Sequence, residues 1–284
     1  MESKMKTWRT SLVAAALVAS ASAASAADVT EVPIYDWTGF YVGVSGGYGW
    51  GNLDPKFQNN GYQSNVEGVP LTDPVTEWYD FDDCDGSFTS GWGAGTIDYC
   101  GDTSNLSGMF GGIQAGYNFQ ADSFVFGLEA DAFLSSIDGD GDADWSYDYG
   151  SPDTGNTETS IDYDVDAFGT VRARAGFAID RFMPYVTGGL AWGLVDVSAD
   201  SYNVNNNSDP DTSFSGSDSH TALGWALGAG AEYAITDSMT MKVEYVYVDL
   251  GSVKSKFEYD DGGPYNLKTD INMHTVKVGL NWKF

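Results

Sequence analysis

Apolar and polar residues alternate with a period of two along eight stretches of this chain. In the first stretch, Phe40, Val42 and Val44 alternate with Gly43 and Ser45. Such alternation is typical of a β-strand whose two faces meet different environments. The strands predicted in this way cover residues 40–50, 109–119, 124–134, 165–177, 186–194, 223–233, 241–247 and 276–284.

The connections between the predicted strands alternate between short and long. Residues 120–123, 180–183 and 236–238 form tight turns, whereas the other connections are rich in Gly, Asn, Asp and Ser. The long connections cover residues 51–105, 137–162, 199–219 and 250–270. Short periplasmic turns and long extracellular loops are typical of outer-membrane barrels. The pattern predicts an all-β fold, an eight-stranded antiparallel up-and-down transmembrane β-barrel with long extracellular loops.

A secreted β-sandwich would show the same alternation, because its strands also have one buried and one exposed face. Here the polar face carries much Gly, Ala and Ser, and the apolar face has aromatic residues near the strand ends. Small residues suit the narrow interior of an eight-stranded barrel, and Trp and Tyr suit the two membrane interfaces. These features favour the membrane barrel.

The first residues have the layout of a secretory signal peptide. Basic residues Lys4, Lys6 and Arg9 precede an apolar run at 12–19 and a small-residue stretch at 20–27. The apolar run is well short of a bilayer span, which argues against a transmembrane anchor. We expect residues 1–27 to be a signal peptide, cleaved after Ala26 or Ala27, and residues 28–284 to form the outer-membrane barrel domain.

Charge and cysteine content narrow the function further. The 284 residues include 13 Lys plus Arg against 41 Asp plus Glu, a formal net charge of −28, which argues against a nucleic-acid partner. Cys84 and Cys100 lie in one Gly- and Asp-rich segment without a neighbouring His. In an exported protein these cysteines predict a disulfide, worth about 3 kcal/mol in the chain-entropy model, in preference to a metal site.

Charged residues also occupy the polar face of five predicted strands. Unpaired charges would be costly in a narrow lumen, so opposite signs should pair across it. The predicted interior network consists of Glu129, Asp131, Arg172, Arg174, Glu232, Lys242, Glu244 and Lys277. We interpret it as a charged plug that closes the barrel; a narrow selective pore is the alternative.

Three segments resemble the porin-like surface-antigen family of alphaproteobacterial outer-membrane proteins. Residues 36–43 (DWTGFYVG) are similar to its first strand, residues 168–176 (FGTVRARAG) to its fourth, and residues 275–284 (TVKVGLNWKF) to its last. The resemblance implies contact with periplasmic chaperones and with the outer-membrane assembly machinery, which reads a terminal aromatic residue preceded by alternating apolar residues. The implied signal consists of Val276, Val278, Leu280, Trp282 and Phe284.

The sequence contains no complete motif for a catalytic or metal site. The acidic run at 138–144 spaces its carboxylates like a calcium loop, but Ala143 and Tyr149 stand where that loop requires Gly and Glu. We expect only weak, diffuse calcium binding there. His220 has Asp218 and Ser219 nearby, yet adjacent strand residues face opposite sides, and His274 lacks a partner serine at suitable spacing. We predict no catalytic residue and no cofactor.

The first long connection carries six aromatic residues around the predicted disulfide, namely Trp78, Tyr79, Phe81, Phe88, Trp92 and Tyr99. They could bind an external ligand or a host surface, or pack on one another and order the loop. The function expected is a surface barrel that supports envelope integrity and contacts lipopolysaccharide and external partners. A small-pore porin is the alternative, and a lipid A-modifying barrel enzyme is the third hypothesis.

Overall fold

The computed structural model describes the backbone of residues 35–59, 79–80, 96–101, 105–148, 154–205, 214–258 and 264–284. The ten strands are β1 (Gly39–Asn59), β2 (Tyr79–Asp80), β3 (Thr96–Gly101), β4 (Asn105–Ala121), β5 (Phe124–Asp148), β6 (Thr154–Phe177), β7 (Phe182–Asn205), β8 (Phe214–Ala234), β9 (Met239–Glu258) and β10 (Pro264–Lys283). The predicted signal peptide, Cys84 and the side chain of Cys100 lie outside the described parts. Among the described residues, no helix is long and apolar enough to cross a membrane.

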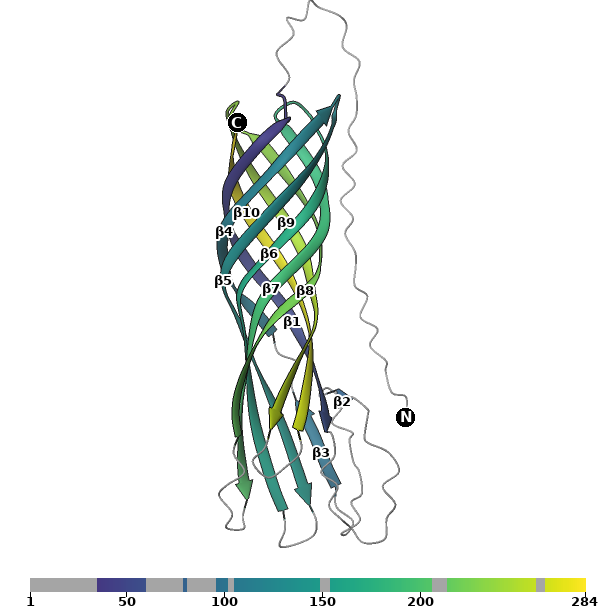
Figure 1. Ribbon diagram of the computed structural model, residues 1–284, viewed down its shortest axis with the longest axis vertical. Helices are drawn as coiled ribbons and strands as arrows, with labels where there is room; N and C mark the ends of the chain where they lie inside the picture. Colours follow the sequence, from purple (N-terminus) through teal and green to yellow (C-terminus); the bar gives the residue numbers. More distant parts are fainter. Residues whose placement is uncertain are drawn as a thin grey trace, which may run out of the picture. The chain divides into compact units, whose positions relative to one another are not determined.

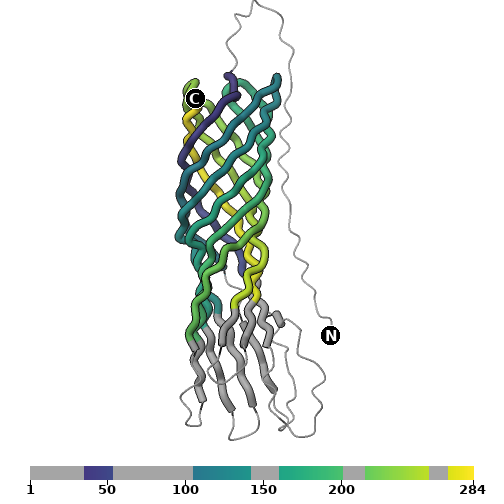
Figure 2. Tube along the Cα trace, in the orientation of Figure 1, coloured from purple at the N-terminus to yellow at the C-terminus, as the bar shows by residue number. Residues whose placement is uncertain are grey.

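Eight long strands form a closed antiparallel barrel, as the sequence predicts. Each of them pairs with its neighbour along the chain, and β10 returns to pair with β1 from Tyr41–Lys283 to Asn59–Tyr265. The start of the barrel therefore runs beside its end (Figures 1 and 2). The short strands β2 and β3 add to β1 and β5 near one end of the barrel.

Three tight turns define one end of the barrel, which we call the turn end. Asp122 and Ser123 join β4 to β5, residues 178–181 join β6 to β7, and residues 235–238 join β8 to β9. Asp122 and Asp180 both have φ of +53°, a left-handed conformation that Asp tolerates better than most residues. Since short turns face the periplasm in such barrels, the opposite loop end faces outward.

The strands are longer than the sequence pattern predicts, so the expected loop ranges were wrong in part. Strand β5 continues to Asp148 and β6 starts at Thr154, inside the expected loop 137–162. The expected loops 199–219 and 250–270 are likewise largely strand. The acidic run at 138–144 therefore belongs to a strand, whose extended backbone does not wrap around an ion as a calcium loop does.

In β5, β6 and β9, β-bulges explain why the pattern ended the strands too early. Pairing shifts register between Leu134 and Ile137 in β5, between Val165 and Ala167 in β6, and opposite Gly251 in β9. An extra residue breaks the period of two. In β6 the buried positions change from odd numbers up to Val165 to even numbers from Phe168. Unbroken alternation over residues 165–177 would place Asp166 on the same face as Arg172 and Arg174, but Asp166 lies on the outer face.

The outer surface carries a belt of exposed apolar side chains. Leu134, Leu190 and Leu223 are 76%, 71% and 75% exposed, and aromatic residues such as Tyr48 and Trp225 lie in the same belt. Soluble monomers rarely expose contiguous apolar areas of this kind. Hydrocarbon is the solvent that accommodates such a belt, because closure of the barrel leaves no unpaired strand edge inside the membrane.

Candidate functional site: the sealed lumen

The eight predicted interior charges form one buried cluster inside the barrel. They come from β5, β6, β8, β9 and β10, and each is at most 6% exposed. Successive residues of a strand face opposite sides, so these positions point inward while their apolar neighbours point to lipid. The structure thus brings together every member of the predicted set.

Glu129 lies at the centre of this cluster. Its carboxylate accepts hydrogen bonds from Lys242 Nζ at 2.7 Å to both oxygens, from Arg172 Nη2 at 3.1 Å and from the Tyr41 hydroxyl at 2.7 Å. Arg174 Nη1 approaches the same carboxylate at 3.6 Å. Three cations from two other strands, β6 and β9, therefore surround one buried anion.

Arg172 links Glu129 to two further carboxylates. Its guanidinium forms a two-pronged contact with Glu244, Nη1 to Oε1 at 3.0 Å and Nη2 to Oε2 at 3.1 Å, and Nη2 donates to Asp131 at 2.8 Å. Lys277 Nζ lies 2.8 Å from Asp131 and 2.9 Å from Glu244, which completes a ring of alternating charge. Paired contacts of this geometry are the stronger class of ion pair.

Arg174 and Glu232 extend the cluster toward the turn end. Arg174 Nη2 donates to Glu232 at 2.7 Å, and its guanidinium stacks 4.0 Å from the centre of the Tyr185 ring. Glu232 also accepts hydrogen bonds from Thr240 and, at 2.9 Å, from Asn281. The four acids and four bases of the cluster balance in charge, and that balance permits their burial at this depth.

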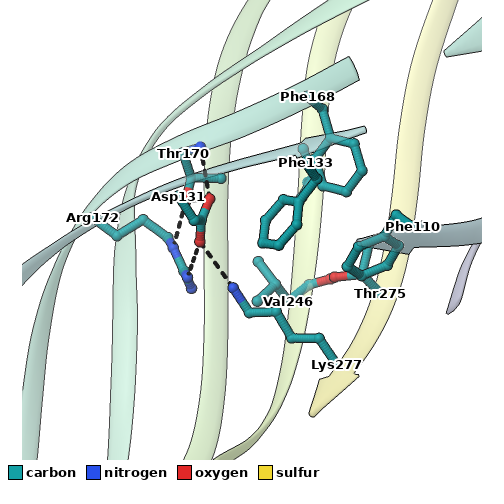
Figure 3. A pocket seen from close by; sticks show the side chains of 10 residues that line it. Phe110, Asp131, Phe133, Phe168, Thr170, Arg172, Val246, Thr275 and Lys277 are labelled. Carbon is teal, nitrogen blue, oxygen red and sulfur yellow. Dashed lines mark hydrogen bonds and ion pairs between the residues drawn. The ribbon is translucent and has the colours of Figure 1, made fainter. Parts of the chain in front are cut away.

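An apolar layer fills the barrel next to the charges, on the loop side. The rings of Phe110, Phe133 and Phe168 lie 5.1 Å apart pairwise, and Lys277 Nζ lies 4.9 Å from the Phe133 ring centre (Figure 3). The cavity between this layer and Asp131 has a volume of about 10 Å³, which is room for one water at most. The buried cluster continues through Ile137, Leu53, Leu106, Ile161, Tyr163, Val165, Val195, Val197, Val253, Ile271 and Met273.

A third layer covers the turn end of the lumen. Trp37 precedes β1 and is 1% exposed; its backbone N–H donates to Gln120 Oε1 at 2.8 Å and its indole N–H to the Asp180 carbonyl at 3.2 Å. Tyr35 packs edge to face on Trp37, with ring centres 4.8 Å apart. Together with Met183 and Tyr185 these residues form a small apolar cluster inside the mouth.

Sequence reasoning missed two of these three layers. Phe110, Phe133 and Phe168 lie on the polar face of their strands, and this placement was the available signal for an apolar plug. In the sequence, Trp37 stands out only as part of the family-like segment 36–43. Tyr41 and Tyr185 were not identified as partners of the charges, because a single tyrosine on an inward position does not reveal which strand it faces.

The two histidines show no catalytic arrangement. His220 Nε2 lies 3.1 Å from Asp218 Oδ2 and 3.0 Å from Ser255 Oγ, so the carboxylate and the hydroxyl share one ring nitrogen. A Ser–His–Asp relay needs them on different nitrogens. His274 faces outward, accepts or donates a hydrogen bond at 2.6 Å with Tyr245 OH, and stacks beside Trp50. Its surroundings are aromatic.

The outer face of β5, β6 and β7 is acidic just beyond the apolar belt. Asp138, Asp164 and Asp196 are cross-strand neighbours in one row. Partial burial and then the nearby charges of Asp138 and Asp166 raise the pKa of Asp164. A hydrogen bond with Asp196 and its charge raise the pKa of Asp166. These carboxylates therefore repel one another at neutral pH.

The predicted assembly-signal residues occupy the end of β10. Val276, Val278 and Trp282 are exposed on the outer face, Leu280 is partly exposed, and Phe284 is 80% exposed next to the Phe40 ring. Their outward placement is compatible with recognition by other proteins and equally with contact to lipid. Of the aromatic residues expected in the first long connection, Tyr79 and Tyr99 fall in β2 and β3, and the others lie outside the described residues.

A closed eight-stranded barrel with an apolar belt outside and buried charges inside defines a transmembrane β-barrel protein. The profile of the outer membrane protein β-barrel domain family matches residues 11–284. The chain belongs to this family, and its location is the cell outer membrane.

Relatives agree with the surface-antigen resemblance. The 31 kDa outer-membrane immunogenic protein of Brucella melitensis is 36% identical over 277 residues, which cover 97% of this chain and 94% of the relative. The 25 kDa outer-membrane immunogenic protein of Brucella abortus is 26% identical, with 96% of each chain covered. Among solved structures, OprG from Pseudomonas aeruginosa is 13% identical with a TM-score of 0.40, covering 87% of this chain and 96% of that one.

Proposed function

We propose that this protein is a non-conducting, non-enzymatic surface barrel that supports the integrity of the outer membrane. Its role is to fill the membrane with a rigid cylinder and to present an acidic outer face and its loops to lipopolysaccharide-bound cations and to external partners. The observation that carries the proposal is the seal of the lumen by three successive layers: the Trp37 cluster, the charge network and the phenylalanine plug.

The charge network favours a closed lumen over a polar pore. A conducting pore needs hydrated side chains, whereas Arg172, Lys242 and Glu244 are at most 1% exposed and are engaged with one another or with Glu129. Opening a path would separate buried ion pairs, and breaking such pairs is strongly unfavourable. We therefore expect no general solute permeability.

Planar-bilayer recording of the refolded protein tests this proposal. The expected result is a baseline current without stable steps at moderate voltage. A refolded porin measured in the same membranes is the positive control. Reproducible open-channel steps would reject closure and favour the small-pore alternative.

The enzymatic alternative has its own test. If His274 or His220 took part in a reaction on lipid A, substituting either by Ala would change the acylation pattern of lipid A from cells that express the protein. We expect the pattern to be identical for the wild type, His220→Ala, His274→Ala and a deletion strain. Any difference between wild type and deletion that a histidine substitution abolishes would establish catalysis.

A further inference from the structure

The described pairing between β8 and β9 stops short of the loop end. The described hydrogen-bond ladder between them runs from Ala234–Thr240 to Trp225–Asp249 and includes no pair beyond that point. Both strands nevertheless continue, β8 back to Phe214 and β9 on to Glu258, each paired with its other neighbour. We call this boundary beyond the ladder the seam.

A bulge in β9 lies at the start of the seam. Gly251 has φ of +69°, a left-handed conformation suited to glycine, and its N–H donates to Asp249 Oδ1 at 2.8 Å. The bulge adds one residue to β9 relative to β10 and lies directly after the last described pair with β8, Trp225–Asp249. On the lumen side His220 Nε2 lies 3.0 Å from Ser255 Oγ across the seam. This contact closes the seam inward, so the exposed side of the seam faces the membrane surface.

Aromatic rings lie at the end of the seam that is nearer to the turn end. The Trp225 and Tyr247 rings are 5.3 Å apart, and Tyr247 lies 5.1 Å from His274, which stacks beside Trp50. These rings form the loop-side edge of the apolar belt on β8, β9, β10 and β1. Tyr and Trp at this position lie at the depth of lipid headgroups. The seam therefore opens where the membrane changes from hydrocarbon to sugar and phosphate.

The two walls of the seam carry different chemistry. On β8 the outward residues are hydroxylic, with Ser217, Ser219 and Thr221 all exposed. On the other side, Lys254 of β9 and Lys268 of β10 are direct cross-strand neighbours on the outer face. Lys268 lies 3.5 Å from Asp270, so its charge is partly compensated.

The lysines are concentrated on this side of the barrel. Strands β4 to β8 contain no Lys or Arg except Arg172 and Arg174, which face the lumen. Lys56 of β1 is in register with Lys268, although Asp80 of β2 is opposite it. In a chain with a net charge of −28, basic residues beside a boundary where the described strand pairing ends favour an anionic partner with many hydrogen-bonding groups.

We propose that the seam binds the headgroup of an anionic outer-leaflet glycolipid, lipopolysaccharide. Its acidic groups pair with Lys254 and Lys268, its sugar hydroxyls bond to the β8 hydroxyls and to the backbone of β8 and β9 beyond the described ladder, and its first sugars lie over Trp225 and Tyr247. This inference rests on the proposed role in the envelope and names the site at which the lipid is held.

Amide hydrogen exchange on the full chain, refolded in detergent, tests the site. Purified lipopolysaccharide should protect amides of residues 215–224 and 250–255. Phosphatidylglycerol, which is anionic without sugar, and inorganic phosphate should protect them much less. Equal protection by either probe would overturn the proposal, and so would protection that rises with protein concentration alone, because a second copy would then pair with the free edges.

Variants connect the protection to the lysines. Replacing Lys254 and Lys268 together by Gln should weaken lipopolysaccharide binding roughly tenfold or more. Lys283→Gln, at the turn end, is the control for loss of one positive charge and should bind as the wild type does. If the double variant keeps full affinity, the seam is not the site, although the bilayer recordings would still support a sealed barrel.

Discussion

Arg172 is the residue on which the interior depends most. It contacts Glu129, Asp131 and Glu244 while fully buried, so its loss leaves these carboxylates with only lysines to compensate them. We expect Arg172→Met to lower the free energy of unfolding by about 3–5 kcal/mol. Urea unfolding in detergent, followed by tryptophan fluorescence, measures the change.

Arg181 provides a matched control for that substitution. It pairs with Asp237 at 2.7 Å, but the two side chains are 39% and 92% exposed. An exposed pair contributes little, so Arg181→Met should cost less than about 1 kcal/mol. Equal losses for the two arginines would show that burial of the network contributes nothing to stability.

The raised pKa of Asp164, on the outer face, predicts that the stability of the barrel depends on pH. Partial burial and the neighbouring carboxylates raise its pKa in the folded barrel, which favours the protonated form. The stabilisation from this shift is complete below the pKa of the unfolded chain and is lost as pH rises through the folded pKa. Asp164→Asn should therefore raise the thermal midpoint at pH 7 and raise it less at pH 4. Asp164→Glu, which keeps the charge, should show no such gain; a midpoint for Asn that shifts equally at both pH values contradicts the repulsion.

At the scale of elements, the end of β10 should determine assembly. Phe284 lies where β10 closes on β1: its backbone N–H donates to the Phe40 carbonyl at 2.9 Å, while its side chain stays exposed. Deleting Phe284 should reduce insertion while export continues, and Phe284→Tyr should restore it. The measurement is the amount of heat-modifiable protein in the outer-membrane fraction. Wild-type amounts of the truncated protein would argue against the signal.

The strands also show what alternation alone can and cannot predict. It placed Glu129, Arg172 and Lys277 on the inner face, because between bulges the period of two maps sequence directly onto the faces of a sheet. It failed at Asp166 and beyond Tyr247, where an extra residue reverses the faces. A bulge depends on the pairing of two strands, and a single strand's sequence does not display it.

The sequence pattern also could not predict the depth at which each layer lies inside the barrel. Phe110, Phe133 and Phe168 come from three strands and meet only because the stagger between strands places them at one height. The charges could be predicted as a set because their signs must balance in any closed lumen. Which carboxylate contacts which cation follows from the stagger and required the structure.

At the scale of the whole molecule, the distribution of charge matches the closed lumen. Among the described side chains away from the turn end, the cations lie in two places: Arg172, Arg174, Lys242 and Lys277 neutralise the lumen, and Lys254 and Lys268 flank the seam. Most acids are left on the loop side, where repulsion among them is relieved by solvent or by bound cations. The resulting molecule has a neutral interior, an apolar belt and an acidic outer surface.

Orientation of the whole barrel is open to a direct test. An epitope inserted between residues 60 and 75, in the connection after β1, should be tolerated and should bind antibody on intact cells. The same epitope placed between Asp237 and Ser238, in the tight turn before β9, should bind antibody only after the outer membrane is permeabilised. Both insertions leave the inward residues of the strands unchanged, so both proteins should remain heat-modifiable. Labelling of the turn rather than the loop on intact cells would reverse the orientation and place the seam and its lysines on the periplasmic side, away from lipopolysaccharide.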